Sequence, residues 1–326
     1  MSNPGAVTNT AEWEQKCSHP EYKRIQMKKN ALSKTIKYLQ SAEGSAYIFI
    51  FPSIILLMMF NIIPLLAAFG LSFFDVPITL DSAKFIGIEN FKTAFSDARF
   101  VNSLKVTAIF TAIEVPVQVI GAMIIAAFIS ENNLKNKFFR AIYFLPVICS
   151  ATAIGIMWKM ILHSNVGFFT YALSSMGLGR INFFNDTHMA IFTVAFISIW
   201  RSFGISAIIY VTAIQNVNGS LYEAAKMDGA GSLRQFIDVT VPSIRPTFWF
   251  ILMTRFAGSL QIFDIIYMTT NGGPNYTTES TVTYVYSRAF SSGSQMGYAS
   301  TLSVILFAVI MIVTVIMNKR MNSEDM

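Results

Sequence analysis

The stretch EAAKMDGA at residues 223–230 is hydrophilic and lies between two strongly apolar segments. Its alanines favour a helix, and Asp-Gly supplies a left-handed turn that can end one. We expect a short helix capped by Ser220, a break at Gly229, and a second short helix that Ser232 caps and Pro242 ends. The small side chains leave room for the backbone of a partner protein. An ordinary amphipathic connector would also have this pattern.

Apolar residues dominate the rest of the chain. Of the 326 residues, 53% are hydrophobic and 13% are charged, and the mean hydropathy is +0.51. This composition is too apolar for an ordinary soluble domain and indicates a membrane protein. A helix of about 20 residues crosses the hydrocarbon core. We therefore predict an all-α membrane protein with six transmembrane helices, at about 46–74, 104–130, 141–162, 190–214, 247–268 and 298–317.

The basic residues predict how these helices cross the membrane. Fifteen of the 24 Lys and Arg residues lie in four polar segments, which are the tail 1–43, the connector 131–140, the loop 216–246 and the tail 318–326. Cytoplasmic loops carry an excess of Lys and Arg, so we expect both termini and the 216–246 loop to be cytoplasmic. The net charge of +6 therefore indicates orientation and not nucleic-acid binding. The first tail also lacks the apolar core of a cleaved signal peptide.

The loop resembles a known sequence signature. Glu-Ala-Ala at 223–225 is followed after three residues by Gly229, then after nine residues by Val239, and one residue later by Val-Pro at 241–242. This order resembles the loop of permease subunits of binding-protein-dependent ABC importers. In that family Ile and Leu are more common at the two positions where Val239 and the second Val stand.

The resemblance extends over about residues 44–317. Within this family, the sequence is similar to the maltose-type "F" half of a heterodimeric permease pair, in carbohydrate uptake family 1. One departure is Val-Asn at 217–218, where the family commonly has an apolar residue and Pro. The other matching patterns are Phe144-Leu145-Pro146, Trp158-Lys159, Trp200, Tyr222, Phe263-Asp264, Thr270-Asn271-Gly272-Gly273-Pro274 and Gly297-Tyr298-Ala299-Ser300.

By this resemblance, residues 44–317 form half of the translocation pathway for a carbohydrate, an oligosaccharide, in the bacterial plasma membrane. The implied partners are a second homologous permease subunit, two cytoplasmic ATPase subunits, an extracytoplasmic solute-binding protein and membrane lipid, with no nucleic acid. ATP and Mg would be used by the ATPases, and this chain would be a transport subunit and not an enzyme, with no cofactor or metal. The implied ATPase-coupling residues are Glu223, Ala224, Ala225, Asp228, Gly229 and Pro242.

Motifs for catalysis are missing from the sequence. No Gly-x-x-x-x-Gly-Lys-Ser/Thr run occurs, so the chain is not expected to hydrolyse ATP by itself. His19, His163 and His188 are dispersed, with no Cys, Asp or Glu at metal-ligand spacing, and we interpret them as surface residues.

Charged residues inside the predicted helices are the other informative feature. A charge at the bilayer centre costs about 2.5–3.5 kcal/mol, so these side chains should face the bundle interior, a cavity or one another. These charged side chains could pair with one another or contact a solute, and the sequence allows both. Polar and aromatic neighbours suit a sugar, although helix packing would also explain the rings. The predicted substrate-pathway residues are Glu114, Arg201, Arg255, Gln261, Phe263, Asp264 and Tyr267.

A self-sufficient secondary transporter or channel is the alternative function. The intramembrane charges would then form a proton or ion relay. Such a carrier has no need for a small helical hairpin with outward charges, which favours the ABC permease. A membrane-embedded enzyme is the third hypothesis, and no catalytic cluster supports it.

Overall fold

The computed structural model describes residues 42–76, 83–177, 179–291, 293 and 295–324. The chain divides into two compact units, Met1–Ala67 and Ala68–Met326. Almost all of the predicted N-terminal tail lies outside the described residues.

The first unit is helical over its described part. Its elements are α3 (Ala42–Leu57), the π-helical η1 (Met58–Ile62) and the start of α4 (Ile63–Leu71). Residues Phe49–Leu71 are long and apolar enough to cross a membrane, which agrees with the span predicted at 46–74. Pro64 has no N–H to donate to the carbonyl of Phe60, and the wide turn of η1 lies just before it. The helix therefore continues past the proline.

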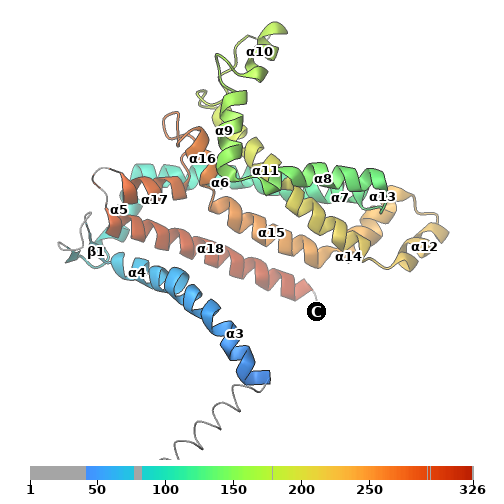
Figure 1. Ribbon diagram of the computed structural model, residues 1–326, viewed down its shortest axis with the longest axis horizontal. Coiled ribbons are helices and arrows are strands. Elements are labelled where there is room, and N and C mark those ends of the chain that lie inside the picture. The colour runs from blue at the N-terminus through green and yellow to red at the C-terminus, as the bar shows by residue number, and fades with distance from the viewer. Residues whose placement is uncertain (1–41, 77–82, 178, 292, 294, 325–326) are drawn as a thin grey trace, which may run out of the picture. The chain divides into compact units, whose positions relative to one another are not determined.

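The second unit is a bundle of helices with one short strand pair, in which Phe74 lies opposite Phe85. Figure 1 shows α5 and α17 at one end of this unit and α12 at the opposite end. In chain order the elements are β1 (Phe74–Asp75), β2 (Lys84–Phe85), α5 (Glu89–Ser96), α6 (Ala98–Pro116), η3 (Val117–Gly121), α7 (Ala122–Ile129), α8 (Leu134–Ile148), α9 (Ala151–Ile161), α10 (Phe168–Ser175), α11 (Met189–Gln215), α12 (Gly219–Met227), α13 (Ser232–Gln235), η4 (Phe236–Thr240), α14 (Val241–Ser243), α15 (Arg245–Leu260), α16 (Asp264–Thr269), α17 (Thr281–Phe290) and α18 (Met296–Glu324).

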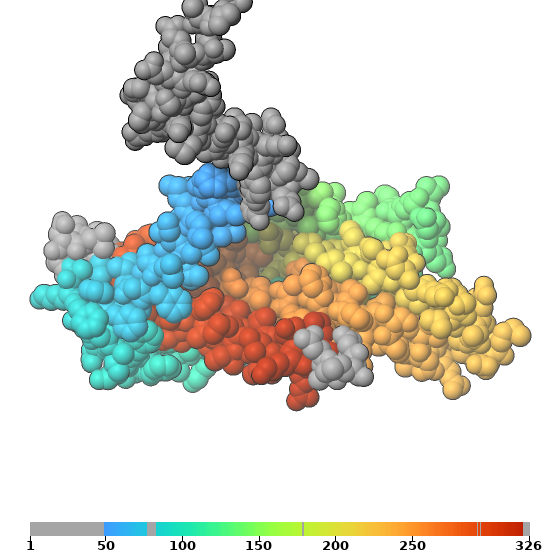
Figure 2. All heavy atoms as spheres, turned by 90° about the horizontal axis from the view of Figure 1, so that it is seen from below, coloured from blue at the N-terminus to red at the C-terminus, as the bar shows by residue number. Residues whose placement is uncertain are grey.

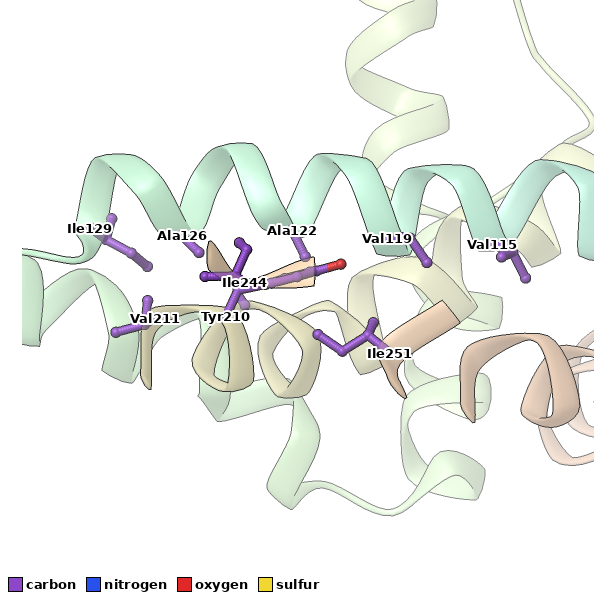
Figure 3. Packing of buried hydrophobic residues seen from close by; sticks show 10 residues of the cluster. Val115, Val119, Ala122, Ala126, Ile129, Tyr210, Val211, Ile244 and Ile251 are labelled. Carbon is purple, nitrogen blue, oxygen red and sulfur yellow. The ribbon is translucent and has the colours of Figure 1, made fainter. Parts of the chain in front are cut away.

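The largest apolar cluster joins α7, α11 and α15. Ala122 and Ala126 are fully buried, and their small side chains let α7 pack closely on α11 around Tyr210 (Figure 3). Ile244 and Ile251 complete the cluster from the start of α15. This packing holds three helices together, and two of them, α11 and α15, carry Arg201 and Arg255.

Within the described residues, five helical segments are long and apolar enough to cross a membrane. A sixth span results if the bent pair α8 and α9 is counted as one. The predicted helix at 190–214 is confirmed by α11. The four candidate spans of the second unit are Ala98–Ile129, Met189–Gln215, Arg245–Thr269 and Met296–Met321.

The region predicted as one helix at about 141–162 contains the end of α8 and all of α9. The chain bends by 99° between α8 and α9. The Ser150 side chain caps α9, and Asn133 caps α8 by accepting a hydrogen bond from the Asn136 N–H (2.7 Å). Two polar caps therefore define two helices within one apolar run. The predicted connector at 131–140 is wrong over most of its length, because α8 begins inside it.

Two further boundaries differ from the prediction. The span predicted at 247–268 is interrupted between α15 and α16, where the Ser280 hydroxyl donates to the carbonyl of Ile262 (2.6 Å). The predicted C-terminal tail at 318–326 is helical up to Glu324 as part of α18. The helices α5 and α17 were not predicted, because they are too polar to be recognised as apolar runs.

Candidate functional site

The 216–246 loop begins with the exposed helix α12. The Asn218 side chain caps this helix by accepting a hydrogen bond from the Ser220 N–H (3.1 Å). The predicted Ser220 cap is wrong, because the helix starts two residues earlier than expected. Glu223 and Ala224 are exposed and Ala225 is half-buried.

Gly229 ends α12 in the conformation that the sequence predicts. Its φ is +76°, in the left-handed region that favours glycine. The Gly229 N–H donates to the carbonyl of Lys226 (3.0 Å), and the Ala230 N–H donates to the carbonyl of Ala225 (2.9 Å). These two bonds are a Schellman motif, which satisfies the last carbonyls of the helix. A Cβ at Gly229 would meet no atom of the described chain within 4 Å, so a larger side chain there would point into open space.

The second half of the loop differs from the prediction. Gly231 and not Ser232 is the N-cap of α13, and it makes no side-chain cap bond. Pro242 does not end the helix, because α13 runs through η4 into α14 and the chain turns only at Ile244. As at Pro64, a π-helical turn precedes the proline and accommodates its missing N–H.

A side-chain hydrogen bond joins the two halves of the loop. The hydroxyls of Tyr222 and Thr240 form a hydrogen bond (2.8 Å) that joins α12 to η4. The large apolar side chains of Met227, Leu233 and Ile237 are exposed. In the space-filling view of Figure 2, the gold atoms of this loop are the part of the second unit farthest from the cyan atoms near α5. The loop thus presents an apolar surface with charged neighbours at one extremity of the unit.

A row of polar side chains crosses the contact between α6, η3 and α11. The Ser198 hydroxyl donates to the buried Glu114 carboxylate (2.7 Å). One turn further, Gln118 is fully buried, donates to the Ser202 hydroxyl and accepts from Ser206. Glu114 is therefore one member of a hydrogen-bonded row that runs through an apolar bundle.

Two arginines lie near this row. Arg201 on α11 and Arg255 on α15 are half-buried, and the Nε atom of each is buried with no hydrogen-bond partner in the described part of the chain. Arg255 interacts electrostatically with both Glu114 and Arg201. No ion pair joins these groups among the described residues. The structure therefore brings three of the predicted charges together without pairing them closely.

The fourth predicted charge, Asp264, is exposed at the start of α16 and forms no ion pair within the described residues. Beside it, the rings of Phe263 and Tyr267 are stacked with centroids 5.1 Å apart. Tyr286 contacts both rings at 5.0 and 5.2 Å. Gln261 lies in the break before α16 and donates to the carbonyl of Ala257 (3.1 Å). Sequence reasoning missed Tyr286 because α17 was not predicted.

A second polar network lies at the α5 end of the unit. We call Asp97, Arg99, Glu279, Tyr284, Arg288 and Tyr298 the Asp97 network. Arg99 donates two hydrogen bonds to the buried Glu279 carboxylate (2.7 and 2.8 Å). Asp97 caps α6 and accepts hydrogen bonds from the hydroxyls of Tyr284 and Tyr298. An Asp directly before a long apolar run is a helix-start signal that could have identified the cap from the sequence.

Burial and hydrogen bonding act in opposite directions on these groups. Burial by itself would raise the pKa of Asp97, but the hydrogen bonds from Tyr284, Tyr298 and two backbone N–H groups together hold that pKa below its ordinary value. Burial, with the bond to Asp97, raises the pKa of Tyr284 to about 12. Asp97 is therefore an ionised acceptor at neutral pH, and Tyr284 is a neutral donor.

The sequence of residues 93–323 matches the family of binding-protein-dependent transport system inner membrane components. The chain belongs to this family. The permease is thus a transport subunit and not an enzyme, and the alternative of a self-sufficient carrier is set aside. The matched region contains the loop, the polar row with its arginines, and the Asp97 network.

Individual relatives agree with this assignment. The probable ABC transporter permease protein YurN of Bacillus subtilis (strain 168) is 31% identical over 81% of this permease and 91% of its own length. The lactose transport system permease protein LacF of Rhizobium radiobacter is 30% identical over 83% of this permease and 91% of its own length. A chain of a bacterial ABC transporter involved in import of the acidic polysaccharide alginate has a TM-score of 0.77 at 23% identity, over 90% of this permease and 99% of that chain. The last comparison shows a shared fold.

Proposed function

We propose that this permease is one half of the membrane pathway of an ATP-driven importer in a bacterial plasma membrane, and that it carries a carbohydrate delivered by an extracytoplasmic binding protein. Family membership and the lactose permease relative support the transport role and the carbohydrate class. A second homologous permease subunit forms the other half, and two cytoplasmic ATPase subunits, which bind ATP and Mg, supply the energy.

The observation that carries this proposal is the form of the loop. The coupling residues Glu223, Ala224 and Asp228 are exposed around a helix that ends in a glycine turn. A short exposed helix with apolar neighbours can sit in a cleft of an ATPase subunit and transmit its displacement to the membrane helices. Ala225, Gly229 and Pro242 set the shape of that element.

The proposed pathway passes the intramembrane charges and the aromatic cluster. Glu114, Arg201 and Arg255 lie in candidate spans, and Gln261, Phe263, Asp264 and Tyr267 lie in or just after the break between α15 and α16. In this proposal residues 44–317 make six spans, with the bent pair α8 and α9 as one of them. Both tails, 1–43 and 318–326, and the loop 216–246 are cytoplasmic.

Reconstitution tests the function, and reporters test the orientation. Proteoliposomes with both permeases and the ATPases should take up a labelled oligosaccharide only when ATP and the binding protein are present. Uptake without ATPase subunits would indicate a self-sufficient carrier. A reporter fused after Asn271-Gly272 should be outside the cell, and one fused near Gly231 should be inside. The reverse pair of locations would contradict the proposed orientation.

A further inference from the structure

We propose that Arg201 and Arg255 form a receptor for an oxyanion group of the solute, so that the permease carries an acidic carbohydrate. This inference rests on the proposed function, because it names the substrate class of the same pathway. The oxyanion is a carboxylate, sulfate or phosphate on the sugar.

Glu114, Arg201 and Arg255 form a cluster with a net positive charge. Two guanidinium groups and one carboxylate lie within electrostatic range, and Arg201 repels Arg255. Arginine stays protonated in proteins, so neither group can lose its charge to relieve the repulsion. The Glu114 carboxylate is partly engaged by Ser198 (2.7 Å). The cluster therefore has one uncompensated positive charge inside the membrane-spanning part of the permease.

The hydrogen-bond capacity of the arginines is the second observation. A guanidinium group has five N–H donors in a planar fork. The Nε atoms of Arg201 and Arg255 are both buried without an acceptor in the described chain, although a buried unsatisfied donor is costly. The neighbouring polar groups Gln118, Ser202 and Ser206 bond one another. The two arginines therefore keep unused donors, and the fork geometry of a guanidinium group matches a planar oxyanion.

The exposed face of α15 shows where such a group can approach. Thr254, Gly258 and Gln261 are exposed at helical spacing beside Arg255. A Cβ at Gly258 would meet no atom of the described residues within 4 Å, so this chain leaves open space next to the arginine. Lipid would favour apolar side chains on that face. A polar and small face inside a candidate span therefore lines the solute pathway.

A carboxylate of the second permease is the other possible source of negative charge. Small residues such as Gly258 also let membrane helices pack closely, so the open face of α15 does not by itself separate the two sources. The unused Nε donors of both arginines point to a planar oxyanion with several acceptors. We assign this oxyanion to the solute, and co-purification of the second permease with the arginine variants separates the two sources.

The test is a binding titration on the complete importer, purified in detergent without the binding protein, so that the permease alone sets the preference. The probes are two disaccharide pairs, digalactose with digalacturonate and cellobiose with cellobiouronic acid, which differ only in oxidation at C6. We expect the acidic member of at least one pair to bind about tenfold or more tightly than its neutral partner, as a charge-assisted pair should give. Arg255→Gln and Arg201→Gln should each bring the binding of the acidic member to within about threefold of its neutral partner. Arg255→Lys should keep part of it. Lys159→Gln, which removes an exposed positive charge on α9, is the matched control and should keep all of it.

Two other outcomes would contradict the receptor. Equal binding of acidic and neutral sugars, unchanged in the glutamine variants, would overturn the receptor. Glutamine variants that no longer co-purify with the second permease would show that its carboxylate is the true partner, and would also overturn it. ATP-driven uptake of saccharides by the reconstituted importer is measured separately. If uptake fails for every saccharide, the proposed function fails and not only the acidic preference.

Discussion

The Asp97 network and the 216–246 loop lie at opposite ends of the second unit and use their polar groups in opposite ways (Figure 1). In the network, Asp97 and Glu279 each accept several hydrogen bonds from other elements. In the loop, a hydrogen bond between the Tyr222 and Thr240 hydroxyls joins α12 to η4, and large apolar side chains are exposed. Charges that are satisfied within the chain stabilise its fold, whereas exposed groups with few internal contacts are available to a partner. Changes in the two regions should therefore separate stability from coupling.

The largest expected effect is loss of transport from a change in the loop. Glu223→Lys reverses the charge that we assign to the ATPase contact, and Gly229→Asp places a side chain in a left-handed turn at a strain cost on the order of 1 kcal/mol. Because both positions are exposed, the protein should still insert into the membrane. We expect uptake to be abolished and the ATPase subunits to be lost on affinity purification.

Glu131→Lys is the control for the first of these changes, since it reverses an exposed acidic residue before α8 and outside the coupling loop. It should retain both uptake and the ATPases. A Gly229→Asp permease that co-purifies with its ATPases and transports normally would mean that the loop is an ordinary connector.

The second prediction is the converse, in which a change in the Asp97 network lowers stability and leaves the ATPase contact intact. Glu279→Ala removes the carboxylate that two Arg99 donors bind, and the Glu279 side chain is only 3% exposed. Breaking a buried pair costs about 3–5 kcal/mol, and the one-third exposure of Arg99 lowers this to about 2–3 kcal/mol of unfolding free energy. Chemical unfolding of the purified permease in detergent measures the loss, while the ATPases should still co-purify at permissive temperature.

Glu89→Ala is the matched control, because its pair with Lys92 is exposed on both sides (3.4 Å). That change should alter the unfolding free energy by less than about 0.5 kcal/mol. Equal losses from the two variants would remove the distinction between the network and the ordinary surface.

The third prediction concerns pH. The folded-state pKa of Asp97 lies below its ordinary value of 3.8, so ionisation of Asp97 stabilises the fold above that value. This contribution is lost as the pH falls through the lower folded-state pKa. We expect the stability difference between the wild-type permease and Asp97→Asn to be constant above about pH 5 and to shrink below the ordinary value. A difference that grows on acidification would show that the bonds to Tyr284 and Tyr298 do not favour the charged carboxylate.

The sequence predicted the regular apolar helices better than the polar details. The span of α11 was found because both the bundle core and the lipid require apolar side chains. The bend before α9 was missed because its cause is one serine cap inside an apolar run. The charges Glu114, Arg201 and Arg255 could be identified individually, since each interrupts such a run. Their proximity, and the contact of Tyr286 with Tyr267, depend on how three helices pack and could not be read from spacing within one helix.

The smallest expected effect comes from the one hydroxyl pair that joins the two halves of the loop. Tyr222→Phe removes the hydrogen bond to Thr240 (2.8 Å) and keeps the ring, so the unfolding free energy should fall by about 1 kcal/mol or less. The same bond fixes the direction of α12 relative to η4, and a loosely oriented helix would transmit less of the ATPase movement. We therefore expect uptake to fall several-fold while the ATPases still co-purify.

Tyr284→Phe in the Asp97 network is the comparison, because it also removes one tyrosine hydroxyl but lies at the other end of the unit. It should cost at least as much stability and leave the ATP hydrolysed per solute transported unchanged. Tyr222→Phe, in contrast, should raise the amount of ATP hydrolysed per solute transported. If the two variants changed this ratio equally, the loop would have no special part in coupling.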